Sequence, residues 1–526
     1  MVMSAVPTAR DDPGAQGPRA RPVTISIDPE ALGPVVPEDF AGLSFERGPL
    51  NPGNAGVDGY LFRPANDSLV TLFRNVGLRN LRIGGGSVDF YVPAGTGSDG
   101  FTGIDNLFAF AAAAGTRVIY SLRLLSPADK PVDDLESINA HAAGYIWDRY
   151  REHVASFAIG NEPDWHAFHT YAGHPADPAI YEETSGIPGS AYPSYLARWR
   201  GIAQAVAASA PGAPLCGPDT GAYTSLTYTP DPDGGVSWSE RFATDLPSQQ
   251  ITDITQHHYA GADPEATTAE QAIANILSPE WVNGTAIATS PAGTTYIPYP
   301  WLYENNLAAV RATGLRYRMT EANDYLGGVA GASNAFASAL WSLDYLHWWA
   351  AHGAAGVNFH NKQWLLTDTI IPDPAAQAGY AITPKGYGIK AFTLGSAGRV
   401  KPVRTAKPAG LNLTAYCTGT AGDDYVTIIN KTHGVEAADA AVTILPPSPG
   451  PHAVQVMILA SGPPGDAADA SAMRGAALGA TLGGAVITGD ADWQGTWSAL
   501  PTAPDTGISV TVSATTAAVV RIRSGR

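Results

Sequence analysis

The sequence predicts a (β/α)8 barrel followed by an all-β sandwich. Eight short apolar runs, separated by helical patterns, each end in polar or glycine-rich residues. This alternation is typical of a barrel that carries its chemistry at the C-terminal ends of its strands. Beyond about residue 391 the helical patterns stop, and short β-branched runs alternate with Gly, Pro and Asp. That second texture indicates a sandwich.

The predicted barrel strands alternate with amphipathic helices. The first helix, at residues 66–76, has Leu69, Leu72, Phe73 and Val76 at helical spacing. Two longer helices are expected at 194–210 and 334–352, and the aromatic stripe of the last one predicts packing against the barrel. The strands are expected at residues 40–46, 78–83, 116–124, 157–159, 214–219, 251–259, 317–319 and 355–361.

The predicted sandwich has strands at residues 424–429, 441–445 and 453–458 and between 508 and 522. The segment 23–27 precedes the barrel and is expected to add a strand to this sandwich. We therefore predict four parts along the chain: a disordered tail at 1–21, the joining strand at 22–38, the catalytic barrel at 39–392 and the sandwich at 393–526.

Composition restricts the partners. The formal net charge is −17, which disfavours nucleic acid and anionic membrane surfaces because both require a basic patch. No apolar run approaches the roughly 18 residues of a membrane-spanning helix. The start of the chain lacks the apolar centre of a secretory signal. The localisation is left open between a cytoplasmic protein and a secreted one whose signal has been removed.

Two glutamates stand where barrel strands end. Glu162 follows the apolar run 157–159, and Pro163 stops the strand because it cannot continue a central ladder. Glu321 has the same place after the seventh run. Each glutamate alone also fits an ion-paired or helix-capping residue. Together they predict a pair of carboxylates at the rim, which is the machinery of a glycosidase.

The surrounding motif strengthens this interpretation. Gly160-Asn161-Glu162-Pro163 on the fourth strand, with Glu321 ending the seventh, resembles the clan of retaining (β/α)8 glycosidases. The resemblance implies that Glu162 is the acid/base and Glu321 the nucleophile. It also implies that Asn161 binds the 2-hydroxyl of the sugar.

Further motifs resemble one family within that clan, glycoside hydrolase family 79, which contains β-glucuronidases and heparanases. They are GLSFE at residues 42–46, RIGG at 82–85, QHHY at 256–259 and EAN at 321–323. The resemblance covers the chain from about Val23 to its end. It implies a retaining β-glucuronidase that acts by double displacement on a carbohydrate with a terminal β-glucuronic acid. No cofactor is implied.

The resemblance also implies roles for other residues near the strand ends. Tyr259 is similar to the tyrosine that hydrogen-bonds the nucleophile. Glu46 and Asp89 resemble residues that grip sugar hydroxyls, although pairing with an arginine such as Arg82 is the alternative for both. Tyr325, four residues beyond the predicted nucleophile, is expected to face the sugar.

Adjacent histidines on the sixth strand raise the question of a metal. His257 and His258 point to opposite faces of a strand, and no trio of ligands is spaced nearby. We therefore expect no metal site, and we interpret both histidines as satisfied rim or core residues.

The family holds the substrate carboxylate with a Tyr hydroxyl and backbone amides after the eighth strand. Here the loop at residues 360–387 contains Lys362, Tyr380 and Lys385, and Tyr380 is the predicted partner. The chain lacks the Gly-Asn-Tyr triplet that heparanases have after this strand. Because a polysulfated substrate also calls for a basic cleft, both features argue against cleavage of heparan sulfate.

Two other functions are compatible with the same residues. One is a retaining barrel hydrolase that acts on a neutral sugar, similar to arabinofuranosidases. The other is a catalytically silent carbohydrate-binding protein, in which decay of at least one of the four residues Asn161, Glu162, Tyr259 and Glu321 is expected. All four are present.

Overall fold

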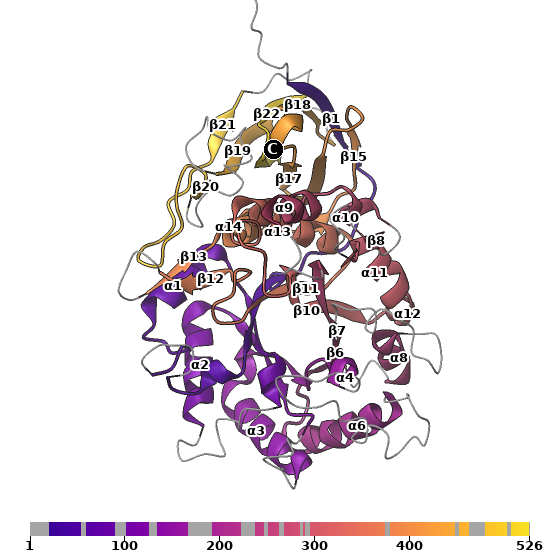
Figure 1. Cartoon of the computed structure of the whole chain (residues 1–526), viewed down its shortest axis with the longest axis vertical. Coiled ribbons are helices and arrows are strands. Elements are labelled where there is room, and N and C mark those ends of the chain that lie inside the picture. Colours follow the sequence, from indigo (N-terminus) through magenta and orange to yellow (C-terminus); the bar gives the residue numbers. More distant parts are fainter. Residues whose placement is uncertain are drawn as a thin grey trace, which may run out of the picture.

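The computed structural model confirms the predicted fold: a closed barrel of eight parallel strands with helices around it, followed by a sheet-rich C-terminal region (Figure 1). The predicted tail at 1–21 lies almost wholly outside the described residues. These are 20–53, 59–89, 101–125, 134–166, 192–221, 237–246, 251–261, 268–284, 288–289, 295–373, 379–447, 452–461, 479–501 and 507–524.

The eight strands form a closed ring, in which the eighth strand along the chain pairs with the first. β10 pairs in parallel with β7 and β11, and β11 pairs in parallel with β2. A short hairpin, β8 (Ala288–Thr289) and β9 (Thr295–Tyr296), extends from the end of β7. The barrel strands are β2 (Ala41–Glu46), β3 (Asn80–Gly84), β4 (Arg117–Leu122), β5 (Val154–Ile159), β6 (Leu215–Thr220), β7 (Asp253–Gly261), β10 (Arg316–Tyr325) and β11 (Gly356–Asn361).

Each of the predicted helices is present within a few residues of its expected bounds. α1 ends at Gly77, whose φ of +84° reverses the chain as a left-handed cap. The described helices are α1 (Asp67–Val76), α2 (Thr102–Ala114), α3 (Leu135–Tyr150), α4 (Pro163–His166), α6 (Tyr192–Ser209), α8 (Trp238–Asp245), α9 (Ala269–Ile276), α10 (Glu280–Asn283), α11 (Tyr299–Asn306), α12 (Ala308–Thr313), α13 (Phe336–Ala351) and α14 (Pro384–Gly395).

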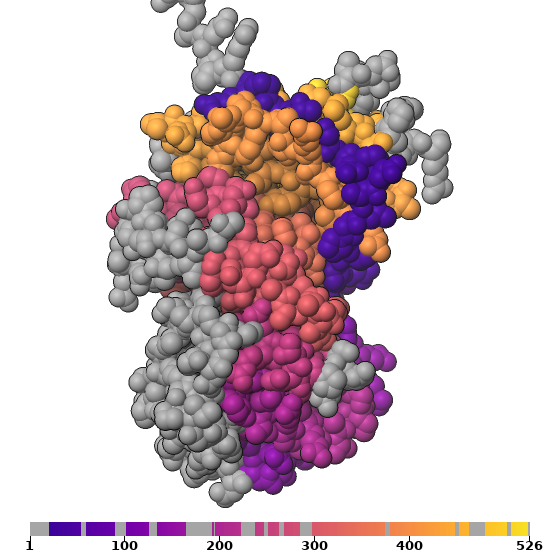
Figure 2. Space-filling model, turned by 90° about the vertical axis from the view of Figure 1, so that its right-hand side faces the viewer, coloured from indigo at the N-terminus to yellow at the C-terminus, as the bar shows by residue number. Residues whose placement is uncertain are grey.

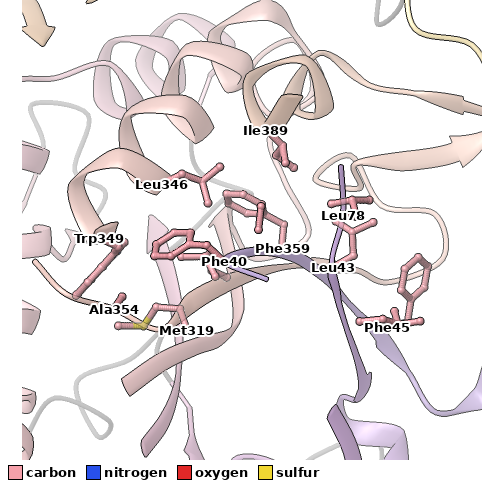
Figure 3. Packing of buried hydrophobic residues seen from close by; sticks show 14 of the residues in the cluster. Phe40, Leu43, Phe45, Leu78, Met319, Leu346, Trp349, Ala354, Phe359 and Ile389 are labelled. Carbon is pink, nitrogen blue, oxygen red and sulfur yellow. The ribbon is translucent and has the colours of Figure 1, made fainter. Parts of the chain in front are cut away.

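Apolar side chains of the barrel strands face outward. Leu43 and Phe359 pack with residues of α13 and α14, among them Leu346, Trp349 and Ile389 (Figure 3). The burial of these aliphatic and aromatic faces supplies the main driving force for the fold. The inside of the barrel is instead polar over much of its length, and its side chains are buried and bonded to one another.

The C-terminal region is two sheets around a second apolar cluster. One sheet has the order β15 (Val403–Ala406), β1 (Arg21–Ile27), β18 (Ala440–Leu445), β22 (Ile508–Val512). Ile25, Ile444, Ile428 and Val520 from the two sheets share the cluster. The second sheet comprises β14 (Arg399–Val400), β16 (Leu413–Gly419), β17 (Asp423–Asn430), β23 (Thr516–Ser524), β19 (His452–Ser461) and β20 (Ala480–Leu482), with β21 (Ser498–Leu500) on β19.

The N-terminal segment joins this region, since β1 runs parallel to β18 and antiparallel to β15. In Figure 2 the N-terminal residues, in indigo, lie along the orange C-terminal region. The run at 508–522 is divided between two sheets, with a turn at Thr515 whose φ is +56°. α14 extends to Gly395, beyond residue 392, where we had placed the domain boundary because the helical sequence patterns stop there.

A buried ion pair connects the barrel to the C-terminal sheets. Asp344 of α13 lies 2.8 Å from the ammonium of Lys431, and it accepts hydrogen bonds from Thr414 and Tyr416. Because removal of one partner would leave an unpaired buried charge, this contact ties the two regions together. None of the helices in the described ranges has the length and apolar character needed to cross a membrane.

Candidate active site

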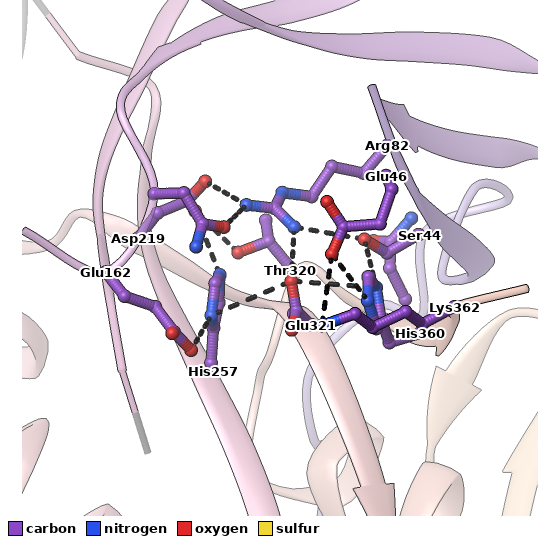
Figure 4. Close-up of polar contacts among 12 residues, drawn as sticks. Ser44, Glu46, Arg82, Glu162, Asp219, His257, Thr320, Glu321, His360 and Lys362 are labelled. Atoms are coloured by element: carbon purple, nitrogen blue, oxygen red, sulfur yellow. Dashed lines mark hydrogen bonds and ion pairs between the residues drawn. The ribbon is translucent and has the colours of Figure 1, made fainter. Parts of the chain in front are cut away.

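The two glutamates predicted at the strand ends lie close together at the carboxyl end of the barrel. A carboxylate oxygen of Glu162, a carboxylate oxygen of Glu321 and a ring nitrogen of His257 all lie within 4.8 Å of one another. All three side chains are buried. Figure 4 shows them with the polar residues of neighbouring strands.

The backbone after β5 turns sharply to present Glu162. Gly160 has a φ of +88°, with Leu124 packed where a Cβ would stand. Glu162 itself has a φ of +46°, a left-handed conformation that costs free energy in any residue with a side chain. Its amide donates to the carbonyl of Asp219, 2.8 Å away, which helps to hold the strained turn.

A β-bulge in β10 presents Glu321. The register with β7 shifts between Met319 and Glu321, so that Thr320 is the extra residue. Met319 and Ala322 both join the apolar cluster outside the barrel. The two residues between them therefore both face inward, which simple alternation along a strand would forbid.

Arg82 connects the groups around the two glutamates. Its guanidinium donates to Glu321 at 2.7 Å, to Asn161 at 2.7 Å and to Asp219 at 2.9 Å. It is fully buried. Burial alone would lower its pKa, but Asp219 and Glu321 outweigh burial and raise the pKa, so Arg82 stays a cation. We call Arg82, Glu162, Asp219, His257 and Glu321 the inner group.

Glu321 is held as a carboxylate. Burial would raise its pKa, but His360, His257 and Arg82 and the hydrogen bond from Tyr259 together bring the pKa far below its usual range. The Tyr259 hydroxyl donates to Oε1 at 2.7 Å, while Arg82 donates to Oε2. The two oxygens are thus fixed by different donors, which orients the carboxylate within the pocket.

His257 lies between the two glutamates, a position that the sequence did not reveal. Its Nδ1 is 2.8 Å from Glu162 and 3.9 Å from Glu321. Burial lowers the pKa of the imidazole, but Glu321 and Glu162 outweigh it and leave a raised pKa. The signal that could have located it is its spacing, because residues two apart on a strand share a face and Tyr259 was already placed at the site.

His258 faces the other way, as alternation predicts. It contacts the Tyr345 hydroxyl of α13 and the carbonyl of Ile297. Burial without a carboxylate partner lowers its pKa to about 3. The expectation that no trio of ligands lies near His257 is wrong, because Glu162, His257 and Glu321 bring three donor atoms within reach of one cation. The Arg82 guanidinium already pairs with Glu321.

A second set of residues, the outer group, comprises Glu46, His360 and Lys362. Glu46 accepts from the amide of Ser87 at 2.8 Å, and its other oxygen lies 3.6 Å from His360 and 3.8 Å from Lys362. Burial would raise the pKa of Glu46, yet His360 and Lys362 lower it. His360 also lies 3.6 Å from Glu321, which joins the two groups.

Asp89 is buried and engaged by backbone. Its Oδ1 accepts from the amides of Leu124 and Leu125, at 2.8 and 2.9 Å, and so secures the chain that leaves β4. Burial raises its pKa, against the effect of these two amides. Its Oδ2 has no hydrogen-bond partner within the described part of the chain. A role toward sugar hydroxyls stays a prediction.

Two of the three predicted tyrosines, Tyr325 and Tyr380, have hydroxyls that contact residues other than the glutamates. The Tyr325 hydroxyl accepts from Asn275 of α9 at 2.6 Å. Tyr380 begins β13 (Tyr380–Ile382), which pairs with β12 (Ile370–Pro372), and its hydroxyl is hydrogen-bonded by Asn66 beside α1. The roles of both toward the substrate stay predictions.

Asp219 is the second residue that sequence reasoning missed. It is the penultimate residue of β6, with a φ of +54° at a shift in register with β7. Besides Arg82 it accepts from Thr320 at 2.6 Å. Burial would raise its pKa, but Arg82 and His257 lower it. No sequence pattern marks a bulge of this kind, so the contact emerges only from the fold.

No protein-family model matches the chain, and no curated protein sequence does so either. Solved structures match it over nearly its whole length. A 4-O-α-L-rhamnosyl-β-D-glucuronidase from Fusarium oxysporum has a TM-score of 0.62 and 14% identity, covering 95% of this chain and 100% of its own. A GH51 arabinofuranosidase from Xanthomonas axonopodis pv. citri also has a TM-score of 0.62 and 14% identity, covering 96% and 100%.

A bifunctional glucanase-xylanase from a metagenome library has a TM-score of 0.64 and 13% identity, covering 96% of this chain and 99% of its own. The chain therefore has the fold of eight-stranded barrel glycosidases with an appended sheet region. At identities this low the structural matches establish the fold alone, and the chemistry has to be argued from the site itself.

Proposed function

We propose that the protein is a retaining β-glucuronidase, similar to family 79 glycoside hydrolases. The observation that carries the proposal is the closeness of the two carboxylates, whose nearest oxygens lie within 4.8 Å. Retaining enzymes place their carboxyl groups about 5 Å apart, whereas inverting enzymes leave roughly 6.5–9.5 Å for a water molecule. The spacing at this site suits direct attack by one carboxylate.

The surroundings of each glutamate suit a different role. Glu321 attacks the anomeric carbon, because its lowered pKa keeps it ionised and its two oxygens are fixed by Tyr259 and Arg82. Glu162 protonates the leaving oxygen and then takes a proton from the water that releases the sugar. His257 bridges the two carboxylates. Asn161, held by Arg82, is placed to bind the sugar 2-hydroxyl.

The preference for glucuronic acid rests on the motifs shared with family 79. A fold neighbour described as a rhamnosyl-glucuronidase supports it. A neighbour described as an arabinofuranosidase equally supports a neutral sugar, the main alternative. The charged residues of the inner group are bonded to one another inside the barrel. A barrel with a purely structural role requires none of them, so their presence argues against a silent carbohydrate-binding protein.

A panel of nitrophenyl glycosides, three β-linked and one an α-L-arabinofuranoside, tests the proposal. We expect kcat/KM for the glucuronide to exceed that for the glucoside, the xyloside and the α-L-arabinofuranoside. A clear preference for any neutral glycoside would contradict the assigned substrate while leaving the two glutamates their roles. If the folded protein turned over none of these substrates, the result would favour a catalytically silent carbohydrate-binding protein.

A further inference from the structure

Lys362 combines a fixed backbone with a free side chain at the edge of the site. It follows β11, and its amide donates to Asp368 Oδ1 at 2.9 Å. The amide of Leu365 donates to the other oxygen of Asp368 at 3.1 Å, so a single carboxylate secures this stretch of loop. The side chain of Lys362 is nevertheless 51% exposed.

The contact between Lys362 and Glu46 is loose. Their charged atoms lie 3.8 Å apart, beyond the roughly 2.7–3.2 Å of a hydrogen bond to oxygen. Water screens the charge of the exposed Lys362, whereas the Glu46 carboxylate is only 9% exposed and has other partners. Glu46 keeps its bond from the Ser87 amide and its contact with His360 if the lysine leaves. Lys362 can thus turn toward another anion at small cost.

Four other cations near this end of the barrel are buried and already engaged. Arg82 binds two carboxylates and Asn161, and Lys385 donates to Asn323 and a carbonyl. Arg47 donates to Tyr120 and a carbonyl, and Arg123 donates to the carbonyl of Asp89. Lys362 differs from them in being half exposed and in having, among the described residues, only the loose side-chain contact with Glu46.

The position of Lys362 matches one end of a bound sugar. Figure 4 shows the outer group across Glu321 from Glu162. In the proposed mechanism the leaving group lies beside Glu162, so we expect the body of the sugar ring to extend from Glu321 toward Glu46 and Lys362. In a uronic acid the carboxylate projects from the ring away from the anomeric carbon.

We propose that Lys362 is the residue that selects for a uronic acid, by turning from Glu46 to the carboxylate of the substrate. Glu46, relieved of the lysine, then accepts from ring hydroxyls. The assignment rests on the proposed function and deepens it. A neutral hexose offers Lys362 no anion, so the lysine stays on Glu46 and contributes nothing to binding.

The test compares Lys362→Met with a matched variant, Lys401→Met. Lys401 is also paired with a single carboxylate, Asp424, but it lies in the C-terminal sheets. The substrates are nitrophenyl β-glucuronide, its uncharged C6 amide and nitrophenyl β-glucoside. We expect Lys362→Met to lower kcat/KM for the glucuronide by roughly 10- to 150-fold, the range of a hydrogen bond to a charged group. For the amide and the glucoside, Lys362→Met should change kcat/KM less than threefold. Lys401→Met should not change kcat/KM for any of the three substrates.

A second variant separates charge from shape. Lys362→Arg keeps the cation and should retain more glucuronidase activity than Lys362→Met. If the wild-type protein prefers the glucuronide but Lys362→Met behaves as Lys401→Met does, the inference is overturned and the proposed function stands. Equal losses on the charged and uncharged substrates also overturn the inference. A wild-type preference for neutral sugars overturns the proposed function and the inference together.

Discussion

The inner and outer groups of the site are built differently. In the inner group the ion pairs of Arg82 and the contact of Glu162 with His257 are 2.7–2.9 Å long, although His257 lies 3.9 Å from Glu321, and all five side chains are buried. In the outer group the charged contacts are 3.6–3.8 Å long, and Lys362 is half exposed. Tight, desolvated groups cannot reorganise during a reaction, which suits transition-state stabilisation. Looser groups can adapt to the ligand, which suits selection of the substrate.

Removing the proposed nucleophile should produce the largest effect. Glu321→Gln deletes the covalent intermediate, so turnover should fall on the order of 10⁶-fold, as when a catalytic nucleophile is removed elsewhere. Glu46→Gln in the outer group should cost roughly 10- to 100-fold, within the range of a lost charged hydrogen bond. Steady-state kinetics on nitrophenyl glucuronide checks both variants, and similar losses would erase the distinction between the groups.

Removing the acid/base should separate substrates by their leaving groups. Glu162→Ala should lower turnover of alkyl glucuronides by roughly 10²- to 10⁴-fold, because a poor leaving group needs a proton. Nitrophenyl glucuronide should lose much less, and added azide should restore turnover and give a β-glycosyl azide. Equal losses on both substrates without rescue by azide would remove Glu162 from this role.

The inner group should also be the more sensitive to loss of charge in stability. Arg82→Met leaves two buried carboxylates, those of Asp219 and Glu321, without their cation, and we expect a loss of about 3–5 kcal/mol in the free energy of unfolding. Arg149→Met is the control, because Arg149 is 48% exposed and its two contacts, the ion pair with Asp148 and the stacking on Tyr145, lie at the surface. Its loss should stay below about 0.5 kcal/mol. Urea unfolding measures both, and a small loss for Arg82→Met would mean that the network is not held by its charge.

The two histidines of β7 should affect stability with opposite dependence on pH. The pKa of folded His257 is raised, by Glu321 and Glu162 against burial. Its contribution is therefore complete below the unfolded pKa of 6.5 and is lost as pH rises through the folded pKa. Burial lowers the pKa of His258 to about 3, so its contribution is complete above 6.5 and is lost as pH falls toward 3.

Replacing each histidine with Asn isolates these contributions. The free energy of unfolding, measured from pH 5 to pH 8.5, should differ from wild type most at low pH for His257→Asn. For His258→Asn the difference should be largest at high pH. If the difference in unfolding free energy from wild type grew in the same pH direction for both variants, the assignment of His257 to the site and His258 to the helix face would be wrong.

The fold was predictable because it depends on patterns that repeat. Apolar runs and helical spacing located all eight strands, and Pro163 indicated where β5 stops. Glu162 and Glu321 were found because each follows such a run. The two glutamates lie together at one rim of the barrel, because the C-terminal ends of all barrel strands lie there.

What escaped prediction depends on departures from regular geometry. The bulge at Thr320 and the left-handed turns at Glu162 and Asp219 have no sequence signature, yet they orient the carboxylates of Glu162 and Glu321. The hydroxyls of Tyr325 and Tyr380 are bonded by Asn275 and Asn66, contacts that only the packing of distant helices decides.

The stereochemistry of hydrolysis tests most directly whether Glu162 and Glu321 form a retaining pair. Proton NMR of nitrophenyl β-glucuronide hydrolysis, recorded before mutarotation, identifies the anomer of glucuronic acid that forms first. Carboxylate oxygens within 4.8 Å of each other predict the β-anomer, through two displacements. If the α-anomer forms first, a water molecule attacks directly, and the assignment of Glu321 as the nucleophile is wrong.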